Sequence, residues 1–148
     1  LLFQNTVNTS MAAIRGMKKN NWGRIINMTS VSVKEPLAYL ALSNTIRSAV
    51  TSWGKTLSIE SGKNNITVNN ILTGFFNTKR LNQLNSEKAK KFNIEIEDVF
   101  DKMSEMVPLK RIGEPEEFGY LVAFLSSEFA NYINGANIPI DGGLLKSM

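Results

Sequence analysis

The chain has 148 residues, of which 43% are apolar and 20% charged, and its net charge of +4 suits a single globular domain. The absence of Cys and His excludes disulfides, thiolate nucleophiles, a Ser-His-Asp triad and imidazole metal sites. The basic residues are dispersed, so we interpret them as a solvated surface and expect no nucleic-acid partner. No apolar segment approaches the ~20 residues of a membrane span and no signal-peptide pattern is present, so we expect a cytoplasmic protein with no membrane partner.

Two helices and a strand are expected in the first part of the chain. Apolar residues recur at three- and four-residue spacing over residues 1–19, which predicts a helix. This helix begins with no initiating Met and no capping residue, so we expect the sequence to be truncated ahead of it. The continuous apolar segment 24–29 predicts a buried strand. Pro36 keeps the residue before it extended, so a second helix is expected from about residue 40 to residue 61, with Gly62 as its C-terminal stop.

The remaining sequence continues the alternation of strands and helices. Residues 66–72 are rich in β-branched side chains, which predicts a short strand. Residues 79–92 are basic and weakly amphipathic, whereas residues 95–107 form a clearer amphipathic helix. Pro115 is placed to open another helix, and residues 137–140 predict a last short strand. This order predicts three neighbouring parallel strands with flanking helices, part of a doubly wound α/β sheet whose first strand leaves one edge unpaired.

Six short motifs follow one another along nearly the whole chain. They are Trp22-Gly-Arg-Ile-Ile-Asn27, Lys55-Thr-Leu-Ser-Ile-Glu60, Ile66-Thr-Val-Asn69, Leu72-Thr-Gly74 with Thr78, Pro108-Leu-Lys-Arg-Ile-Gly-Glu-Pro-Glu-Glu117 and Gly135-Ala-Asn-Ile-Pro-Ile-Asp-Gly-Gly143. In these motifs and their order the chain resembles the C-terminal half of a short-chain dehydrogenase/reductase, similar to 3-oxoacyl-carrier-protein reductases.

The resemblance implies a fold, a reaction and an assembly. The fold would be the C-terminal half of a Rossmann-like sheet, and the reaction a hydride transfer between NAD or NADP and a small carbonyl or alcohol substrate. The nucleotide-binding half with its Gly-rich turn would precede this sequence, which contains no Gly-x-Gly-x-x-Gly. Without those anchors, we expect the chain alone to bind either cofactor poorly. Members of the family commonly form homodimers or homotetramers, so the resemblance implies a homo-oligomer.

The catalytic residues implied by the resemblance are altered in this sequence. The family uses a Ser after the first of these strands, a Tyr and a Lys one helical turn apart, and an Asn on the preceding helix. The corresponding residues are Ser30, Ser43, Arg47 and Leu2, so one of the four is retained. Ser43 and Arg47 lie four residues apart and are expected on one side of their helix.

The replacements change the available acid–base chemistry. A serine hydroxyl is shorter and far less acidic than a phenol, whose pKa is about 10, so Ser43 is a poor proton donor. Arg47 keeps a positive charge that can hold ribose hydroxyls, but it does not release a proton near neutral pH. Tyr39 is a candidate substitute, because in a continuous helix it would share a face with Ser43. Each residue also has an alternative interpretation. Ser43 could be an ordinary hydroxyl at the helix start, Arg47 a solvated cation and Tyr39 a half-buried packing residue.

By resemblance, the nicotinamide end of the cofactor would be held by Arg47 and by the turn after the second strand, through Thr73, Gly74, Phe76 and Thr78. Gly74 would let the backbone approach a ligand closely. The alternative is an ordinary strand-to-helix turn in which Thr78 caps the following helix.

The segment 79–107 corresponds to the helical insert that folds over the substrate in the family. Phe92 and Phe100 either line an apolar substrate pocket or pack the two helices together.

Two functional hypotheses follow from the sequence. The first is an NAD(P)-dependent oxidoreductase with an altered catalytic set, and the second is a non-catalytic relative that binds nucleotide or assembles with partners. The sequence leaves the choice between NAD and NADP open.

Overall fold

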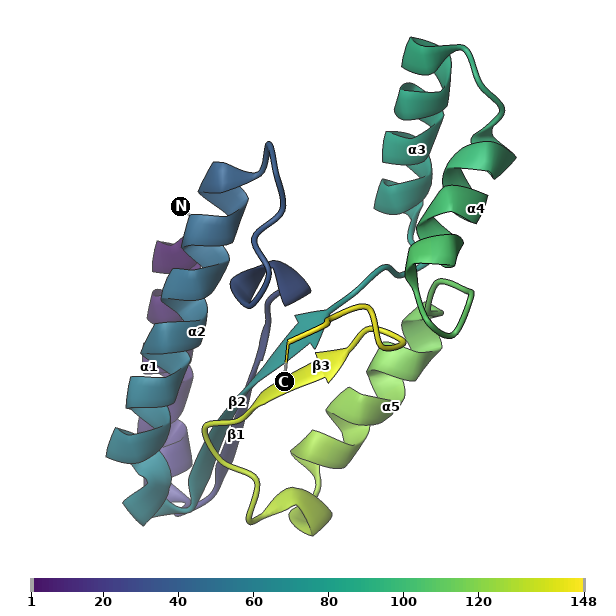
Figure 1. Ribbon diagram of the computed structural model, residues 1–148. Coiled ribbons are helices and arrows are strands. Elements are labelled where there is room, and N and C mark those ends of the chain that lie inside the picture. The colour runs from purple at the N-terminus through teal and green to yellow at the C-terminus, as the bar shows by residue number, and fades with distance from the viewer. Residues whose placement is uncertain (1, 148) are drawn as a thin grey trace.

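A computed structural model describes residues 2–147 as a three-stranded parallel sheet with helices on both faces (Figure 1). The strands are β1 (Gly23–Met28), β2 (Ile66–Thr73) and β3 (Asn137–Ile140), in the order β1-β2-β3. Helices α1 (Leu2–Lys19) and α2 (Ala41–Ser61) lie on one face, and α5 (Pro115–Ser126) lies on the other. The predicted strand order and doubly wound α/β architecture are confirmed.

Each face of the sheet has its own apolar core, because successive side chains of a strand point to opposite faces. On the α1–α2 face, the buried cluster consists of Ile14, Ile25, Leu57, Ile66 and Val68. On the α5 face, Ile71, Leu125 and Ala130 are buried, and Phe118, Leu121 and Val122 of α5 pack against them. Within the described residues β1 and β3 pair only with β2, so each has one free edge. The predicted free edge of β1 is confirmed. The free edge of β3 was not predicted.

Several element boundaries differ by one residue from the sequence prediction: β2 extends to Thr73, and the predicted helix 95–107 spans residues 96–106. Strand β1 ends at Met28, one residue early, although the Thr29 amide still donates to the Ile71 carbonyl at 2.8 Å. The prediction that the second helix stops at Gly62 is confirmed, since α2 ends at Ser61 with Gly62 as its C-cap. Gly62 has right-handed helical backbone angles and continues into a 3₁₀ turn. The left-handed residue that reverses the chain is Asn65, with φ of 54°, because Asn tolerates this conformation better than most residues.

A ladder of asparagine side chains crosses the sheet beneath α2. Asn27 Nδ2 donates to Asn70 Oδ1 at 3.0 Å, and Asn70 Nδ2 donates to Asn137 Oδ1 at 2.8 Å. Asn27 and Asn70 are buried, so each amide needs these partners. Helix α2 approaches the ladder through Gly54, where a Cβ atom would lie 2.7 Å from Asn70 Oδ1 and 2.8 Å from Asn27 Nδ2. The ladder and Gly54 together fix the position of α2 over the strands.

Helices α3 (Lys79–Phe92) and α4 (Ile96–Met106) pack against each other and project away from the sheet (Figure 1). The segment predicted as a helical insert is therefore a helical hairpin. Phe92 is 60% exposed and Phe100 is half-buried. Phe92 is thus mostly exposed to solvent at the end of α3. No helix described between residues 2 and 147 combines the length and apolarity that crossing a membrane requires.

Candidate functional site

Two hollows meet at the carboxyl ends of β1 and β2, the edge at which open α/β sheets bind ligands. The first, which we call the carboxyl-end pocket, has a volume of about 440 Å³. It is lined by Met28, Arg47, Thr73, Gly74, Phe75, Phe76, Thr78, Arg80, Leu81, Leu84, Pro115 and Phe118. All five residues predicted to hold the nicotinamide line this one pocket.

The second hollow, which we call the β1-edge groove, lies between α1, α2 and β1 and has a volume of about 700 Å³. Its lining includes Leu2, Ser43 and Arg47. The prediction that Ser43 and Arg47 face the same side of their helix is therefore confirmed. Leu2 is 69% exposed and presents an apolar side chain at the position that the resemblance assigned to the family Asn.

Arg47 joins the two hollows, because it lines both. Its Nη1 donates to the Thr29 carbonyl at 2.9 Å and contacts the Met28 carbonyl at 3.5 Å. The Thr73 hydroxyl donates to the same Thr29 carbonyl at 3.0 Å. The guanidinium is thus fixed at the carboxyl end of β1. Within residues 2–147 it forms no ion pair.

The turn after β2 is held by the end of β3 and by the loop before α5. The Gly74 amide donates to the Ile140 carbonyl at 3.0 Å. A Cβ atom at Gly74 would lie 2.7 Å from Asp141 Cα. We expected a glycine at this position because a ligand would approach closely. That reason is incomplete, because packing of residue 74 against the end of β3 already requires a glycine.

Phe76 is positioned by the loop that precedes α5. Gly113 donates to the Phe75 carbonyl at 2.9 Å and accepts from the Asn77 amide at 2.8 Å. The Phe76 ring packs edge-on against Phe118, with ring centroids 6.1 Å apart. The Phe76 amide donates to no other described residue, and Phe76 lines the carboxyl-end pocket.

Thr78 caps α3. Its side-chain oxygen accepts from the Leu81 amide at 3.2 Å, as the alternative interpretation of this residue predicted. The hydroxyl proton is not used in that bond, so Thr78 can cap the helix and still donate to a ligand in the pocket.

Two of the predicted catalytic residues lie outside both hollows. The Ser30 hydroxyl accepts from the Ser32 amide at 3.1 Å and caps a short 3₁₀ turn. Tyr39 is fully exposed, has φ of 65° and precedes α2, which begins at Ala41. The expected helical alignment of Tyr39 with Ser43 is therefore wrong, because the backbone turns left-handed at Tyr39 before the helix starts.

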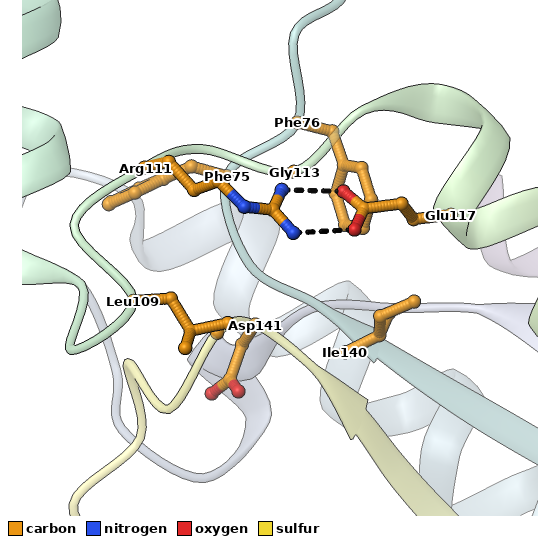
Figure 2. A pocket seen from close by; sticks show the side chains of 9 residues that line it. Phe75, Phe76, Leu109, Arg111, Gly113, Glu117, Ile140 and Asp141 are labelled. Carbon is orange, nitrogen blue, oxygen red and sulfur yellow. Dashed lines mark hydrogen bonds and ion pairs between the residues drawn. The ribbon is translucent and has the colours of Figure 1, made fainter.

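A third, smaller pocket of about 150 Å³ was not anticipated from the sequence (Figure 2). Figure 2 shows the Arg111 guanidinium making two parallel contacts with the Glu117 carboxylate, at 2.6 and 2.7 Å. These hydrogen bonds, with a further one from the Glu114 amide, lower the pKa of Glu117 from 4.5 to about 2. The spacing of Glu114 and Glu117, three residues apart, is the sequence signal that could have indicated this arrangement, because the two residues form a capping box at the start of α5.

The comparisons with known proteins agree with this geometry. Residues 3–145 match the protein family described as enoyl-(acyl carrier protein) reductase. The chain belongs to the short-chain dehydrogenase/reductase family. The family resemblance predicted from the six motifs is thereby confirmed, together with the partial Rossmann-like fold.

Among relatives in the short-chain dehydrogenase/reductase family is the NADPH-dependent reductase BacG of Bacillus subtilis. It is 39% identical over 132 residues, which are 89% of this chain and 51% of BacG. The 3-oxoacyl-[acyl-carrier-protein] reductase FabG of Pseudomonas aeruginosa is 32% identical over 93% of this chain and 51% of its own length. The chain therefore spans about half the length of the curated relatives it matches.

Solved structures of the family show the same arrangement of elements. YwfH, an NADPH-dependent reductase involved in bacilysin biosynthesis, has a TM-score of 0.90 and 35% identity, covering 97% of this chain and 55% of that one. The L-sorbose reductase of Gluconobacter frateurii, complexed with NADPH and L-sorbose, has a TM-score of 0.86 and 33% identity over 93% of this chain and 56% of that one.

Proposed function

We propose that this chain supplies the nicotinamide-binding and substrate-binding side of an NADPH-dependent oxidoreductase that acts on a small carbonyl or alcohol compound. The observation that carries the proposal is that Arg47, Thr73, Gly74, Phe76 and Thr78 all line one pocket at the carboxyl ends of the strands. NADPH is proposed over NADH because relatives such as BacG and YwfH are NADPH-dependent reductases.

The residues present fit the nicotinamide end of such a cofactor. A carboxamide needs both donors and acceptors, and the pocket wall offers the unused amide of Phe76 and the hydroxyl of Thr78. The Phe76 ring supplies an apolar surface beside them. Arg47, fixed on the Thr29 carbonyl, is proposed to hold ribose hydroxyls. The bound cofactor would supply the hydride, while these residues bind and orient it.

The proton-transfer group is the altered part of the proposed site. Ser43 lines the β1-edge groove where the family has a tyrosine. Tyr39 is fully exposed outside α2, so it takes no part in the proposal. By the family resemblance, Leu2, Ser43 and Arg47 replace three of the four catalytic residues, and all three line the β1-edge groove. This replacement supports the alternative, a relative that binds nucleotide or assembles with partners without catalysing the reaction.

Two further proposals follow from family membership. The α3–α4 hairpin, covering the segment 79–107, is proposed as the substrate lid, because Arg80, Leu81 and Leu84 at its base line the carboxyl-end pocket. A homodimer or homotetramer is proposed through α1 and α2. In support, the large apolar residues Met11, Leu42 and Ile59 on these helices are 46%, 75% and 73% exposed.

Saturation-transfer NMR with NADPH tests the proposed binding mode on the chain itself, because the method detects weak binding. We expect the nicotinamide protons to receive more saturation than the adenine protons. Phe76→Ala is expected to reduce the nicotinamide signal. Phe92→Ala is the matched control, because Phe92 is exposed and lines neither hollow. Stronger transfer to adenine than to nicotinamide, or equal effects of the two substitutions, would contradict the proposal.

A further inference from the structure

The charged side chains that line the carboxyl-end pocket are all positive. Arg47 and Arg80 both line it, and no Asp or Glu is among the described residues of its wall. The only ion pair within residues 2–147 joins Arg111 to Glu117, so neither pocket arginine has an acidic partner. A concave site with two guanidinium groups and no acid attracts anions.

Arg80 has more unused hydrogen-bonding capacity than Arg47. Arg47 is fixed on backbone carbonyls at the end of β1. The one side-chain contact of Arg80 within the described residues is a long hydrogen bond, 3.4 Å, from its Nη1 to Gln83 Oε1 on the same helix. A guanidinium has five N–H donors in a planar fork that matches a carboxylate, so most of the donors of Arg80 are available.

Nearby carboxylates do not compete for Arg80. Glu117 is held by Arg111 through contacts of 2.6 and 2.7 Å. Glu114, which immediately precedes the pocket residue Pro115, accepts from Asn77 Nδ2 at 3.2 and 3.4 Å. Glu114 and Glu117 are therefore occupied by partners outside the pocket wall, and Glu116 in the same turn forms no ion pair with Arg80.

Apart from Thr73 and Thr78, the rest of the wall is apolar. Phe75, Phe118, Leu81 and Leu84 line the pocket together with Arg80. Apolar side chains recognise an apolar body, and a few placed polar groups set its orientation. We propose that this pocket selects carbonyl compounds that carry a carboxylate on an apolar body, and that Arg80 recognises the carboxylate. This inference rests on the proposed reductase function and names its substrate class.

Binding of a matched pair of probes tests the inference on the chain without cofactor. The probes are 2-oxo-4-phenylbutanoate and its neutral ethyl ester, and dissociation constants are measured by ligand-observed NMR titration. The unmodified chain should bind the carboxylate about fivefold more tightly than the ester, a modest preference because Arg80 is exposed to solvent. The preference should weaken with added salt.

Arg80→Gln should abolish the preference, and Lys79→Gln should leave it unchanged. Lys79 precedes Arg80 on the same exposed turn and carries the same charge, but it does not line the pocket. Equal binding of the two probes by the unmodified chain overturns the inference. Equal losses of the carboxylate preference in the two variants also overturn the inference, because they would reflect only the general positive charge of α3 and not recognition by Arg80.

The same variants separate this inference from the proposed function. If Arg80→Gln weakens NADPH binding and leaves the carboxylate preference intact, Arg80 contacts cofactor phosphate and the inference fails. If the carboxylate preference depends on Arg80 but NADPH does not bind through its nicotinamide end, the proposed function fails while carboxylate recognition by Arg80 stands.

Discussion

The interior of the sheet and the rim of the carboxyl-end pocket use polar side chains in opposite ways. In the interior, Asn70 is fully buried and its amide is bonded to Asn27 on one side and Asn137 on the other. At the rim, Arg80 has one long contact within its own helix, and the Phe76 amide has no partner among the described residues. The fold uses the first set of polar groups and leaves the second set available for a ligand.

This difference arises from where each group lies relative to the sheet. A buried polar group without a partner destabilises the fold, so the interior contains only groups that the neighbouring strands satisfy. At the carboxyl ends the strands stop pairing, and solvent or a ligand completes the hydrogen bonds. Substitutions in the ladder should therefore change the free energy of unfolding, and substitutions at the hollows should change binding and catalysis.

The largest effect is expected from restoring the proton donor in the β1-edge groove. Ser43 lines a groove of about 700 Å³, which leaves space for a larger side chain. The double change Ser43→Tyr with Arg47→Lys should raise carbonyl reduction by ~10²-fold or more, because positioned acid catalysis contributes ~10²–10⁴-fold. The lysine ammonium would lower the pKa of the new phenol. The measurement is NADPH oxidation by a fusion of this chain to the N-terminal half of BacG.

The matched control for this gain is Ser48→Tyr with Arg47→Lys. Ser48 is exposed on the same helix and does not line the groove, so this variant should show no gain. An unmodified fusion that already reduces the substrate rapidly and loses activity in the Ser43 variant would mean that the native site uses different chemistry. Tyr39→Phe would then test the one other phenol close to the start of α2.

In the interior, Asn70→Ala should lower the free energy of unfolding by about 2–4 kcal/mol, because it removes a buried side chain and leaves the buried Asn27 amide without its acceptor. Urea denaturation measures the change. Asn82→Ala is the matched control on the exposed surface of α3 and should change stability little. A loss as small as that of the control would show that the ladder is not needed for stability, and the contrast with the rim would fail.

The sequence predicted which elements form and which residues meet at the pocket, because both depend on local patterns. The three neighbouring parallel strands followed from the alternation of elements. The convergence of Arg47, Thr73 and Thr78 was implied by the family resemblance, and the three residues line one pocket. These are features that a parallel sheet fixes once its strands are known.

What the sequence did not predict depends on contacts between distant segments. Gly74 is required because Asp141 occupies the space of its Cβ atom, and no local pattern contains that contact. The left-handed backbone at Tyr39 separates it from α2, although its spacing to Ser43 suits a helix. The absence of an acidic partner for Arg80 within residues 2–147 became visible only with the structure, which also shows that Arg111 holds Glu117.

The smallest effect is expected at the Arg111–Glu117 pair. This pair shares one property with each region: it is hydrogen-bonded like the groups of the sheet interior and exposed like those of the pocket rim. The folded-state pKa of Glu117 is lowered from 4.5 to about 2, chiefly by the Arg111 hydrogen bonds. A lowered carboxyl pKa stabilises the fold fully above the unfolded value and loses this contribution as the pH falls toward the folded value. Glu117→Gln should therefore be slightly less stable than the unmodified chain at neutral pH, and the difference should vanish between pH 4.5 and about pH 2.

Thermal unfolding of the two proteins across this pH range measures the effect. The glutamine side chain of the variant keeps an oxygen that can accept from the Glu114 amide, so the substitution isolates the charge from the capping contact. Glu116→Gln is the control, because Glu116 is exposed in the same helical turn and has no ion pair among the described residues. High salt should shrink the Glu117 difference, since an exposed pair is screened. A stability difference that grows on acidification would mean that the Arg111 contacts do not favour the charged carboxylate, and the loop before α5 would then be held in place mainly by Gly113 and Phe76.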